Sequence, residues 1–255
     1  PPRPMLQLER VFPALSEPTM RRYLMGQGVS VLGSWTQNVT LNLVVYHLSG
    51  SAAVLALLNF LLYGPQLVIA PLAGARVNAA NARRSTLSVL YSSMTVACIL
   101  AVLSLLHWLT LPVILALALC AGVLNAIETP SRQVLLLTGL DDPALLPNAI
   151  AMNTMVYNVG RMVGPSMAAI IYPVFGQAAA FLTYAAALVF MAWCVRSMPR
   201  RETAAASPSH DRGGLRNALV YVLDDRFTAK YLSILACMGL LAGSYQTLVP
   251  LLADR

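Results

Sequence analysis

Long blocks of apolar residues, separated by short polar turns, run through most of the chain. Bilayer hydrocarbon is about 30 Å thick and a helix rises about 1.5 Å per residue, so one membrane span needs roughly 20 residues. Helices are expected because backbone N–H and C=O groups cannot bond to water in lipid, and the sequence lacks the alternating strands of a barrel. The expected spans are Tyr23 to His47, Ala52 to Ala75, Ser85 to Leu106, Thr110 to Pro130, Asn148 to Pro173, Gln177 to Val195 and Phe227 to Leu252.

The arginines that lie between the expected spans are found only in alternate connections. Arginines precede the first span, lie between the second and third, follow the fourth as Arg132 and fill the connection between the sixth and seventh, whereas the turns at 47–51, 107–109 and 173–177 contain no Lys or Arg. Cytoplasmic connections carry the excess of Lys and Arg, so the N-terminus is expected in the cytoplasm. The net charge of +7 therefore reflects membrane topology. Nucleic-acid binding is disfavoured, because no basic cluster is interleaved with exposed aromatic residues.

The same pattern divides the chain into four parts. These are a cytoplasmic N-terminal segment (1–22), a six-span bundle (23–195), a cytoplasmic linker (196–226) and the first span of a second bundle (227–255). Within the linker, apolar residues at helical spacing from Leu215 to Leu223 predict a short helix on the membrane surface. One helix of a second bundle cannot bury its own polar face, so about five further spans, forming the missing C-terminal bundle, are expected in the parent protein.

Polar residues of the first expected span gather on one face. At about 100° per residue, six of them fall within an arc of roughly 140°. Hydrogen bonding between helices would explain a few such residues, but a stripe over most of the membrane depth favours a water-accessible substrate path. The six residues are Gln27, Ser30, Ser34, Gln37, Asn38 and Asn42.

Charged residues near the membrane interior are candidates for function, because each is costly at the bilayer centre. Glu128 and Arg132 share one face with Asn125 near the end of the fourth expected span. They either pair with each other as a structural element or take part in the substrate path, and the sequence leaves both open. Glu128 is the candidate proton carrier, although its position near the cytoplasmic end weighs against that role.

Arg161 lies well inside the fifth expected span, on a face with Asn153 and Tyr157. One interpretation makes it a structural partner for Glu128 or for helix-end carbonyls. The other makes it a recognition element for an anionic group or a regulator of a protonating carboxylate. We assign Asn153, Tyr157 and Arg161 to the expected substrate path and leave the two interpretations of Arg161 open.

Two glycine-containing motifs predict packing or gating elements. Gly160, Gly164 and Pro165 form a GxxxG with an adjoining proline, which allows close helix approach and frees a backbone carbonyl. The connection from Gly74 to Arg84 is a short turn with glycine at one end and paired arginines at the other. Such a turn can dock on neighbouring helix ends, although positive-inside bias alone would also explain its cations.

Enzyme chemistry finds no support in the sequence. No GxxxxGK[ST] phosphate loop is present, which disfavours an ATP-driven subunit. His47, His107 and His210 are isolated from ligand-type neighbours, so neither a metal site nor a hydrolytic triad is predicted. The four cysteines all fall inside expected spans and read as small packing residues. We therefore expect no enzyme activity, no metal and no cofactor.

Three stretches together resemble the major facilitator superfamily, and more closely its bacterial secretion-effector branch, which includes the enterobactin exporter and macrolide-efflux proteins. The similarity extends over about Arg21 to Arg255. The stretches are Gly33 to Gln37 with Tyr46 to Ser51, Asn125 to Gln133, and Pro147 to Asn153 continuing through Asn158 to Arg161 and Gly164-Pro165.

This resemblance implies an all-α membrane fold of twelve spans in two bundles, of which this chain holds the N-terminal six plus one. It also implies a central cavity that alternates between the two sides, usually driven by proton antiport. Gly160, Gly164 and Pro165 match part of the superfamily's exporter motif, with Ala151 in place of a further glycine.

The resemblance also assigns a gating role to the turn after the second span. Gly74, Arg83 and Arg84 match the superfamily's cytoplasmic gating motif. Asn78 and Ala79 replace its acidic residue and the following basic one. The missing carboxylate normally pairs with cations at helix ends and stabilises the outward-facing state, so gating is expected to be looser in this protein.

The expected function is proton-coupled export of a small molecule, of the drug or siderophore class, across the bacterial inner membrane. The expected partners are that substrate, protons and the lipid bilayer. A seven-span receptor or sensor is the alternative suggested by the span count alone, and its usual topology would be inverted here. A non-transporting fragment of a transporter is the third possibility.

Overall fold

The computed structural model describes residues 12–198 and residue 230. The chain divides into two compact units, Pro1–Thr203 and Ala204–Arg255, and of the second unit only Lys230 is described. The expected seventh span, the surface helix at Leu215 to Leu223 and the linker beyond Met198 therefore lie outside the described residues.

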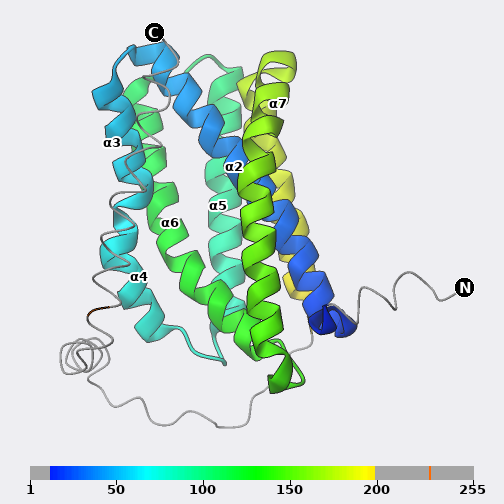
Figure 1. Ribbon diagram of the computed structural model, residues 1–255. Helices are drawn as coiled ribbons and strands as arrows, with labels where there is room; N and C mark the ends of the chain where they lie inside the picture. The colour runs from blue at the N-terminus through cyan, green and yellow to red at the C-terminus, as the bar shows by residue number, and fades with distance from the viewer. Residues whose placement is uncertain (1–11, 199–229, 231–255) are drawn as a thin grey trace, which may run out of the picture. The chain divides into compact units, whose positions relative to one another are not determined.

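The first unit is built from long helices that run side by side (Figure 1). The described residues contain no strand, and the predicted all-α class is confirmed. The elements in chain order are η1 (Pro13–Ser16), α2 (Pro18–Ser49), α3 (Ala52–Tyr63), α4 (Pro65–Arg76), α5 (Ala82–Leu105), α6 (Leu111–Thr138), η2 (Pro143–Leu145) and α7 (Leu146–Arg196).

Two expected spans differ from the helices in the structure. The second span is one continuous stretch, Ala52–Arg76, in which Pro65 lacks the N–H that would continue the helical hydrogen bonds. Helix α3 therefore ends at Tyr63 and α4 begins at Pro65, although Gly64 between them keeps helical angles of φ −56° and ψ −42°. The fourth span was expected to end at Pro130, and this was wrong, since α6 continues to Thr138 with Pro130 inside it. Arg132 was consequently placed after the span, whereas it lies within the helix and is buried.

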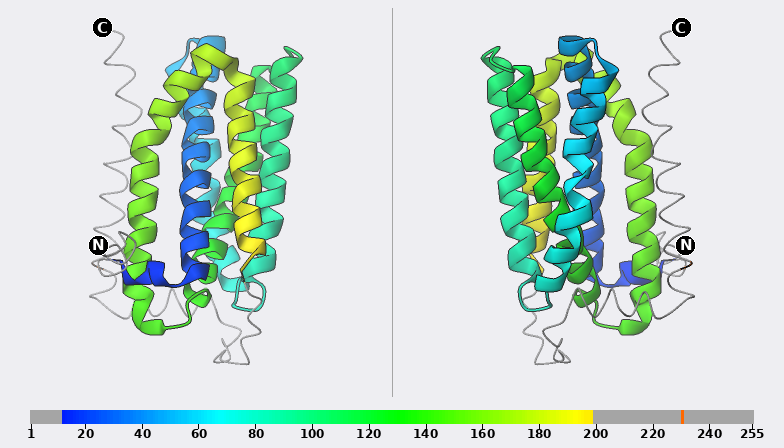
Figure 2. Two further views of the ribbon diagram at one scale, coloured as in Figure 1. Left: turned by 90° about the vertical axis from the view of Figure 1, so that its right-hand side faces the viewer. Right: turned by 90° about the vertical axis from the view of Figure 1, so that its left-hand side faces the viewer.

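The expected fifth and sixth spans are the two halves of α7. The only residue of α7 with non-helical backbone angles is Gly176, at φ 81° and ψ 172°, and it falls in the turn expected between Pro173 and Gln177. A positive φ is accessible to glycine without steric cost, which explains the residue at this bend. Figure 2 shows the two halves descending on either side of α2.

Helix α2 is packed closely between these halves. A Cβ on Gly33 would lie 2.8 Å from the Ala187 Cβ of the second half, and one on Gly160 of the first half would lie 2.5 Å from the Val31 Cγ1 of α2. A Cβ on Gly164 would overlap Trp35. The missing side chains let the backbones approach, as small residues do between membrane helices.

The polar stretch of α2 lies between two apolar clusters. Its first turns contribute Met20, Tyr23 and Leu24 to one cluster, and its later turns contribute Leu41 and Val45 to the other. The stretch from Gln27 to Asn38 falls between them. The apolar clusters thus hold the bundle together above and below a polar layer.

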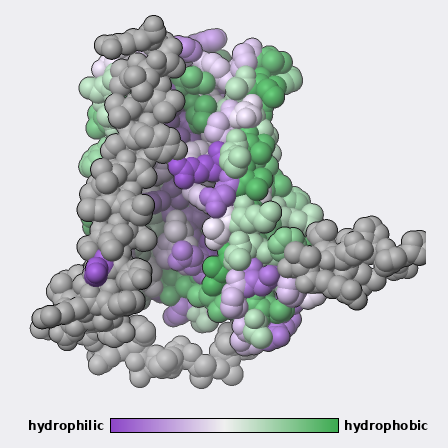
Figure 3. Space-filling model, in the orientation of Figure 1, coloured by the Kyte–Doolittle hydropathy of each residue, from purple (hydrophilic) through white to green (hydrophobic). Residues whose placement is uncertain are grey.

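Apolar side chains also cover much of the outer surface, where lipid is expected. Leu67 is 82% exposed and Met162 is 77% exposed, which a soluble domain would avoid in number but a bilayer stabilises. Figure 3 shows hydrophilic residues gathered toward the middle of one face with hydrophobic residues beside them. Among the described residues, four stretches are long and apolar enough to cross a membrane: Ala52–Arg76, Ala82–Leu105, Leu111–Thr138 and Pro143–Arg196.

Helix α2 is long enough to span a bilayer, but it is not among these four stretches, because its polar residues lower its hydropathy. Those residues point into the bundle. Buried on the inside are Gln27, Ser30, Thr36 and Gln37. The chain is therefore a multi-pass membrane protein whose most polar helix is shielded by its neighbours.

Candidate functional site

A cavity of about 450 Å³ lies inside the bundle, among α2, α6 and both halves of α7, with further contributions from α3, α4 and α5. Nine of the eleven residues predicted for the substrate path line it. They are Gln27, Ser30, Ser34, Gln37, Asn38, Glu128, Arg132, Asn153 and Tyr157. The two that the structure does not bring to the lining are Asn42 and Arg161.

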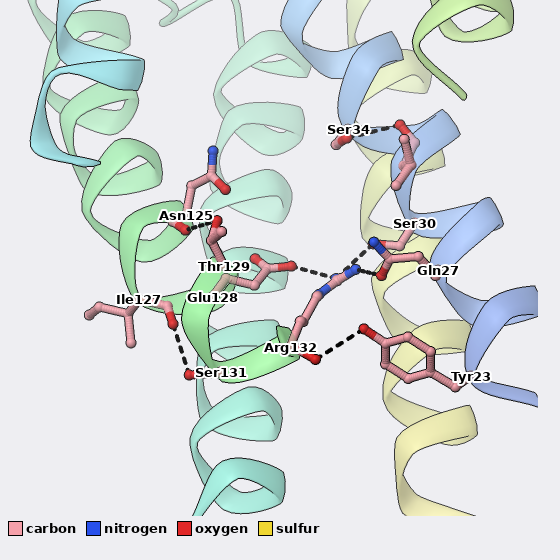
Figure 4. Close-up of polar contacts among 11 residues, drawn as sticks. Tyr23, Gln27, Ser30, Ser34, Asn125, Ile127, Glu128, Thr129, Ser131 and Arg132 are labelled. Carbon is pink, nitrogen blue, oxygen red and sulfur yellow. Dashed lines mark hydrogen bonds and ion pairs between the residues drawn. The ribbon is translucent and has the colours of Figure 1, made fainter. Parts of the chain in front are cut away.

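A buried ion pair and its hydrogen bonds join α6 to α2 at one end of the cavity (Figure 4). The Arg132 guanidinium pairs with the Glu128 carboxylate, and both side chains are about nine-tenths buried, at 10% and 12% exposed. Arg132 also donates to Gln27 Oε1 and, at 2.9 Å, to Ser30 Oγ. The Tyr23 hydroxyl donates to the Arg132 carbonyl at 3.3 Å. One guanidinium is thus held by three side chains.

Helical spacing explains how these residues meet. Glu128 and Arg132 stand four residues apart on α6, where side chains share a face. Tyr23, Gln27 and Ser30 follow one face of α2 at steps of four and three residues. Because α6 continues past Pro130, Arg132 lies beside the polar face of α2.

Asparagine side chains form a second set of contacts farther along α2. Asn38 donates to the Tyr63 hydroxyl on α3 at 2.8 Å. Asn42 donates to the Asn38 carbonyl at 2.8 Å and accepts from Asn59 of α3 at 2.8 Å. Asn42 therefore connects Asn38 of α2 to Asn59 of α3 without lining the cavity.

Two buried acceptors on the cavity wall have no hydrogen-bond partner within the described part of the chain. They are Gln37 Oε1 on α2 and Asn153 Oδ1 on α7. Buried polar atoms are normally paired, so these two oxygens are available to donors that enter the cavity. Ser34, in contrast, donates to the Val31 carbonyl of its own helix at 2.9 Å.

Arg161 is exposed on α7 and lies over the indole of Trp35, with 5.5 Å between its guanidinium carbon and the ring centre. Trp35 itself lines the cavity. Glu128 is paired with Arg132 instead of Arg161. Arg161 thus contacts a residue of the cavity lining without lining the cavity itself.

The predicted gating residues lie away from this cavity. Asn78 and Asn81 accept from each other's backbone N–H groups at 3.0 and 2.8 Å, which forms the turn before α5. Arg83 donates to the Arg196 carbonyl at the end of α7 at 2.6 Å, whereas Arg84 is exposed. Gly74 faces Pro130 of α6, since a Cβ there would lie 3.8 Å from the proline.

Sequence reasoning found Tyr157 but missed the other aromatic side chains of the cavity. Tyr23 continues the polar face of α2 by one helical step, a signal that was present but overlooked. Other missed lining residues lie on separate helices, and the sequence does not determine which side of each of these helices is turned toward the cavity. The missed residues include Tyr23, Trp35, Tyr63, Gln66, Ser93, Thr129, Gln133, Thr154 and Tyr184.

Comparison with known proteins places the chain in a family. The family model of transmembrane secretion effectors, within the major facilitator superfamily, matches residues 11–255. The chain belongs to this family. The predicted superfamily resemblance is therefore confirmed for nearly the whole chain. No solved structure matches it significantly.

A curated relative of this secretion-effector chain is the staphyloferrin A transporter of Staphylococcus aureus. The two are 31% identical over 155 residues, which cover 60% of this chain and 39% of the relative. The chain thus matches well under half of that relative's length. Membership in a transport family and a relative with a transporter's name agree with the expectation that the protein is not an enzyme.

Proposed function

We propose that this secretion-effector chain forms one half of a secondary transporter that exports a small polar molecule by alternating access. The observation that carries the proposal is the cavity of about 450 Å³ with the polar face of α2 along one wall. An ordinary packed bundle would fill this layer with apolar side chains. Polar groups that face a cavity inside a membrane bundle are typical of a substrate path.

The proposed substrate is an oxygen-rich anionic molecule of the siderophore class. Arg132 offers a guanidinium, which binds carboxylates in a two-pronged geometry. The free oxygens of Gln37 and Asn153 accept from hydroxyl or amide groups. Aromatic rings from Trp35, Tyr63 and other lining residues supply apolar contact. The name of the staphyloferrin A relative agrees with this class.

The proposed coupling ion is the proton, carried by Glu128. Among the described residues that line the cavity, Glu128 is the only acidic one, and Arg132, Tyr23 and Tyr184 line the cavity with it. A substrate anion that binds Arg132 competes with Glu128 for the same guanidinium. That competition links substrate occupancy to the state of the carboxylate, as exchange of a proton for the substrate requires.

The proposed location is the bacterial inner membrane, with the N-terminus in the cytoplasm. Support comes from the arginine distribution, which places cations at the ends of the helices where α2 begins and α7 ends. The other half of the transporter would be a second bundle.

An export assay on cells that express the complete gene tests the proposal. Extracellular siderophore is measured at matched protein levels for wild type, Arg132→Gln and Arg76→Gln. Loss of charge-assisted hydrogen bonds predicts at least about a tenfold drop for Arg132→Gln. Arg76→Gln is the control, because Arg76 is exposed at the end of α4 and outside the cavity. A protonophore is expected to stop export by the wild type.

Arg161→Ala in the same assay compares a residue that does not line the cavity with Arg132, which does. We expect a smaller drop than for Arg132→Gln, because Arg161 contacts Trp35 and does not line the cavity. Equal export by wild type and Arg132→Gln would contradict the proposal. Equal export by wild type and Arg161→Ala would remove only Arg161 from the mechanism.

A further inference from the structure

A second cavity, of about 430 Å³, lies at the end of the bundle where α2 and α5 begin and α7 ends. It shares no lining residue with the central cavity. Three arginines, Arg83, Arg84 and Arg196, line it, and among the described residues no Asp or Glu lines it. The described lining therefore concentrates positive charge.

Two of these arginines are held in defined positions. Arg83 donates to the Arg196 carbonyl at 2.6 Å. The Arg196 guanidinium lies over the ring of Tyr91, 5.7 Å from the ring centre. Fixed guanidinium groups lose less freedom when a ligand binds than arginines that extend freely into solvent. Arg84 also lines the cavity and is exposed.

Two of the arginines also lie at a helix end whose partial charge repels them. Arg83 and Arg84 occupy the first turn of α5, the end at which a helix carries partial positive charge. Positive-inside bias requires cations on this side of the membrane, but it does not require them to surround a cavity in the first turn of a helix. An anion in the cavity would offset both unfavourable placements.

We propose that this cavity binds a phosphate-bearing anion. Guanidinium groups of Arg84 and Arg196 match phosphate oxygens in geometry and charge, and the hydroxyls of Thr19 and Ser88 line the same space. The phosphate belongs either to the headgroup of an anionic lipid in the adjacent leaflet or to free inorganic phosphate. This site is independent of the proposed transport cavity.

A binding experiment on the 255-residue chain in phosphatidylcholine nanodiscs tests the site. Short-chain phosphatidylglycerol and inorganic phosphate are titrated separately, and the midpoint of thermal unfolding gives an apparent affinity for each. The test variant is Arg84→Gln with Arg196→Gln, which leaves intact the backbone carbonyl that Arg83 contacts. The control is Arg76→Gln, an exposed arginine outside this cavity.

We expect phosphatidylglycerol to stabilise the wild type and the control equally, and to bind the double variant at least about tenfold more weakly. Stabilisation by the lipid alone identifies a headgroup site, and stabilisation by inorganic phosphate as well identifies a site for the phosphate group itself. Absence of stabilisation by either ligand overturns the proposal. Equal loss of affinity in Arg76→Gln also overturns it, since binding would then follow general surface charge.

Discussion

Two faces of α2 differ in how they contact their neighbours. Toward α7, the helix presents glycines and small residues, and the backbones approach until an added Cβ on Gly33 would lie 2.8 Å from Ala187. Toward α6, it presents Gln27 and Ser30, which reach Arg132 across the edge of a cavity. The first contact is dry and close. The second is polar and leaves space.

This difference separates stability from transport on a single helix. Close apolar packing contributes to the free energy of folding but leaves no room for a substrate. A buried ion pair contributes little net stability compared with apolar residues of the same volume. Arg132 and Glu128 are therefore explained by function more readily than by folding, and substitutions on the two faces should have different consequences.

The largest expected effect comes from separating the ion pair. Arg132→Met leaves Glu128 buried without its cation, which lowers the free energy of unfolding by about 3–5 kcal/mol. The double variant Glu128→Leu with Arg132→Met removes both charges and should recover stability to within about 1 kcal/mol of wild type. Export should be at least about tenfold below that of wild type in both variants. Thermal unfolding in detergent and the export assay measure the two quantities.

Recovery of export together with stability in the double variant would contradict this assignment, because the pair would then be structural. Failure of the double variant to recover stability would show that Gln27 and Ser30, which accept hydrogen bonds from Arg132, are destabilising once the guanidinium is removed.

A smaller effect on stability is expected where Gly33 of α2 packs closely against α7. Gly33→Ala places a methyl group 2.8 Å from the Ala187 Cβ and 3.1 Å from the Tyr184 backbone. Overpacking of this kind costs about 1–3 kcal/mol, and the better helix propensity of alanine offsets about 1 kcal/mol of it. Thermal unfolding should show a net loss of stability. Export per folded molecule should stay close to that of wild type.

Gly28→Ala is the matched control for Gly33→Ala. Gly28 faces the other half of α7, and a methyl group there would meet Val156 at 3.5 Å, an ordinary contact distance. This substitution should therefore raise the free energy of unfolding by up to about 1 kcal/mol. Equal losses at Gly28 and Gly33 would show that the close approach at Gly33 is not specific.

The smallest expected effect on stability concerns the turn before α5. Asn78→Asp keeps the acceptor for the Asn81 N–H and adds a negative charge near a helix start, worth a few tenths of a kcal/mol. Its conformational effect should be larger, because the superfamily's gating motif has a carboxylate here that stabilises the outward-facing state. Cysteines introduced on the inner side should become less accessible, and unchanged accessibility would count against this role.

The helical class and most helix positions followed from hydropathy because lipid leaves the backbone few alternatives. The polar face of α2 was visible for the same reason, since its 3.6-residue period is a local property. The bend at Gly176 fell in a predicted turn, where glycine and proline stand close together in the sequence.

The sequence predictions that were not met concern features that depend on contacts between helices. Pro130 was expected to end α6, yet neighbouring helices stabilise its continuation, and Arg132 moved from a connection into the buried core. Asn42 shares the polar face of α2 but bonds to Asn59 and not to the cavity. Periodicity assigns a residue to a face, and only the neighbouring helix decides whether that face meets a cavity or a partner.

The most direct test of the central claim is water access to the polar face of α2. Cysteine is introduced at Ser34, Gln37 or Asn38 after the native Cys98, Cys120, Cys194 and Cys237 are replaced. We expect a membrane-impermeant thiol reagent to label these positions, whereas Thr40→Cys on the same helix, at a site that is 0% exposed, stays unlabelled. If Ser34, Gln37 and Asn38 resisted labelling from both sides of the membrane, the cavity would not be an aqueous route.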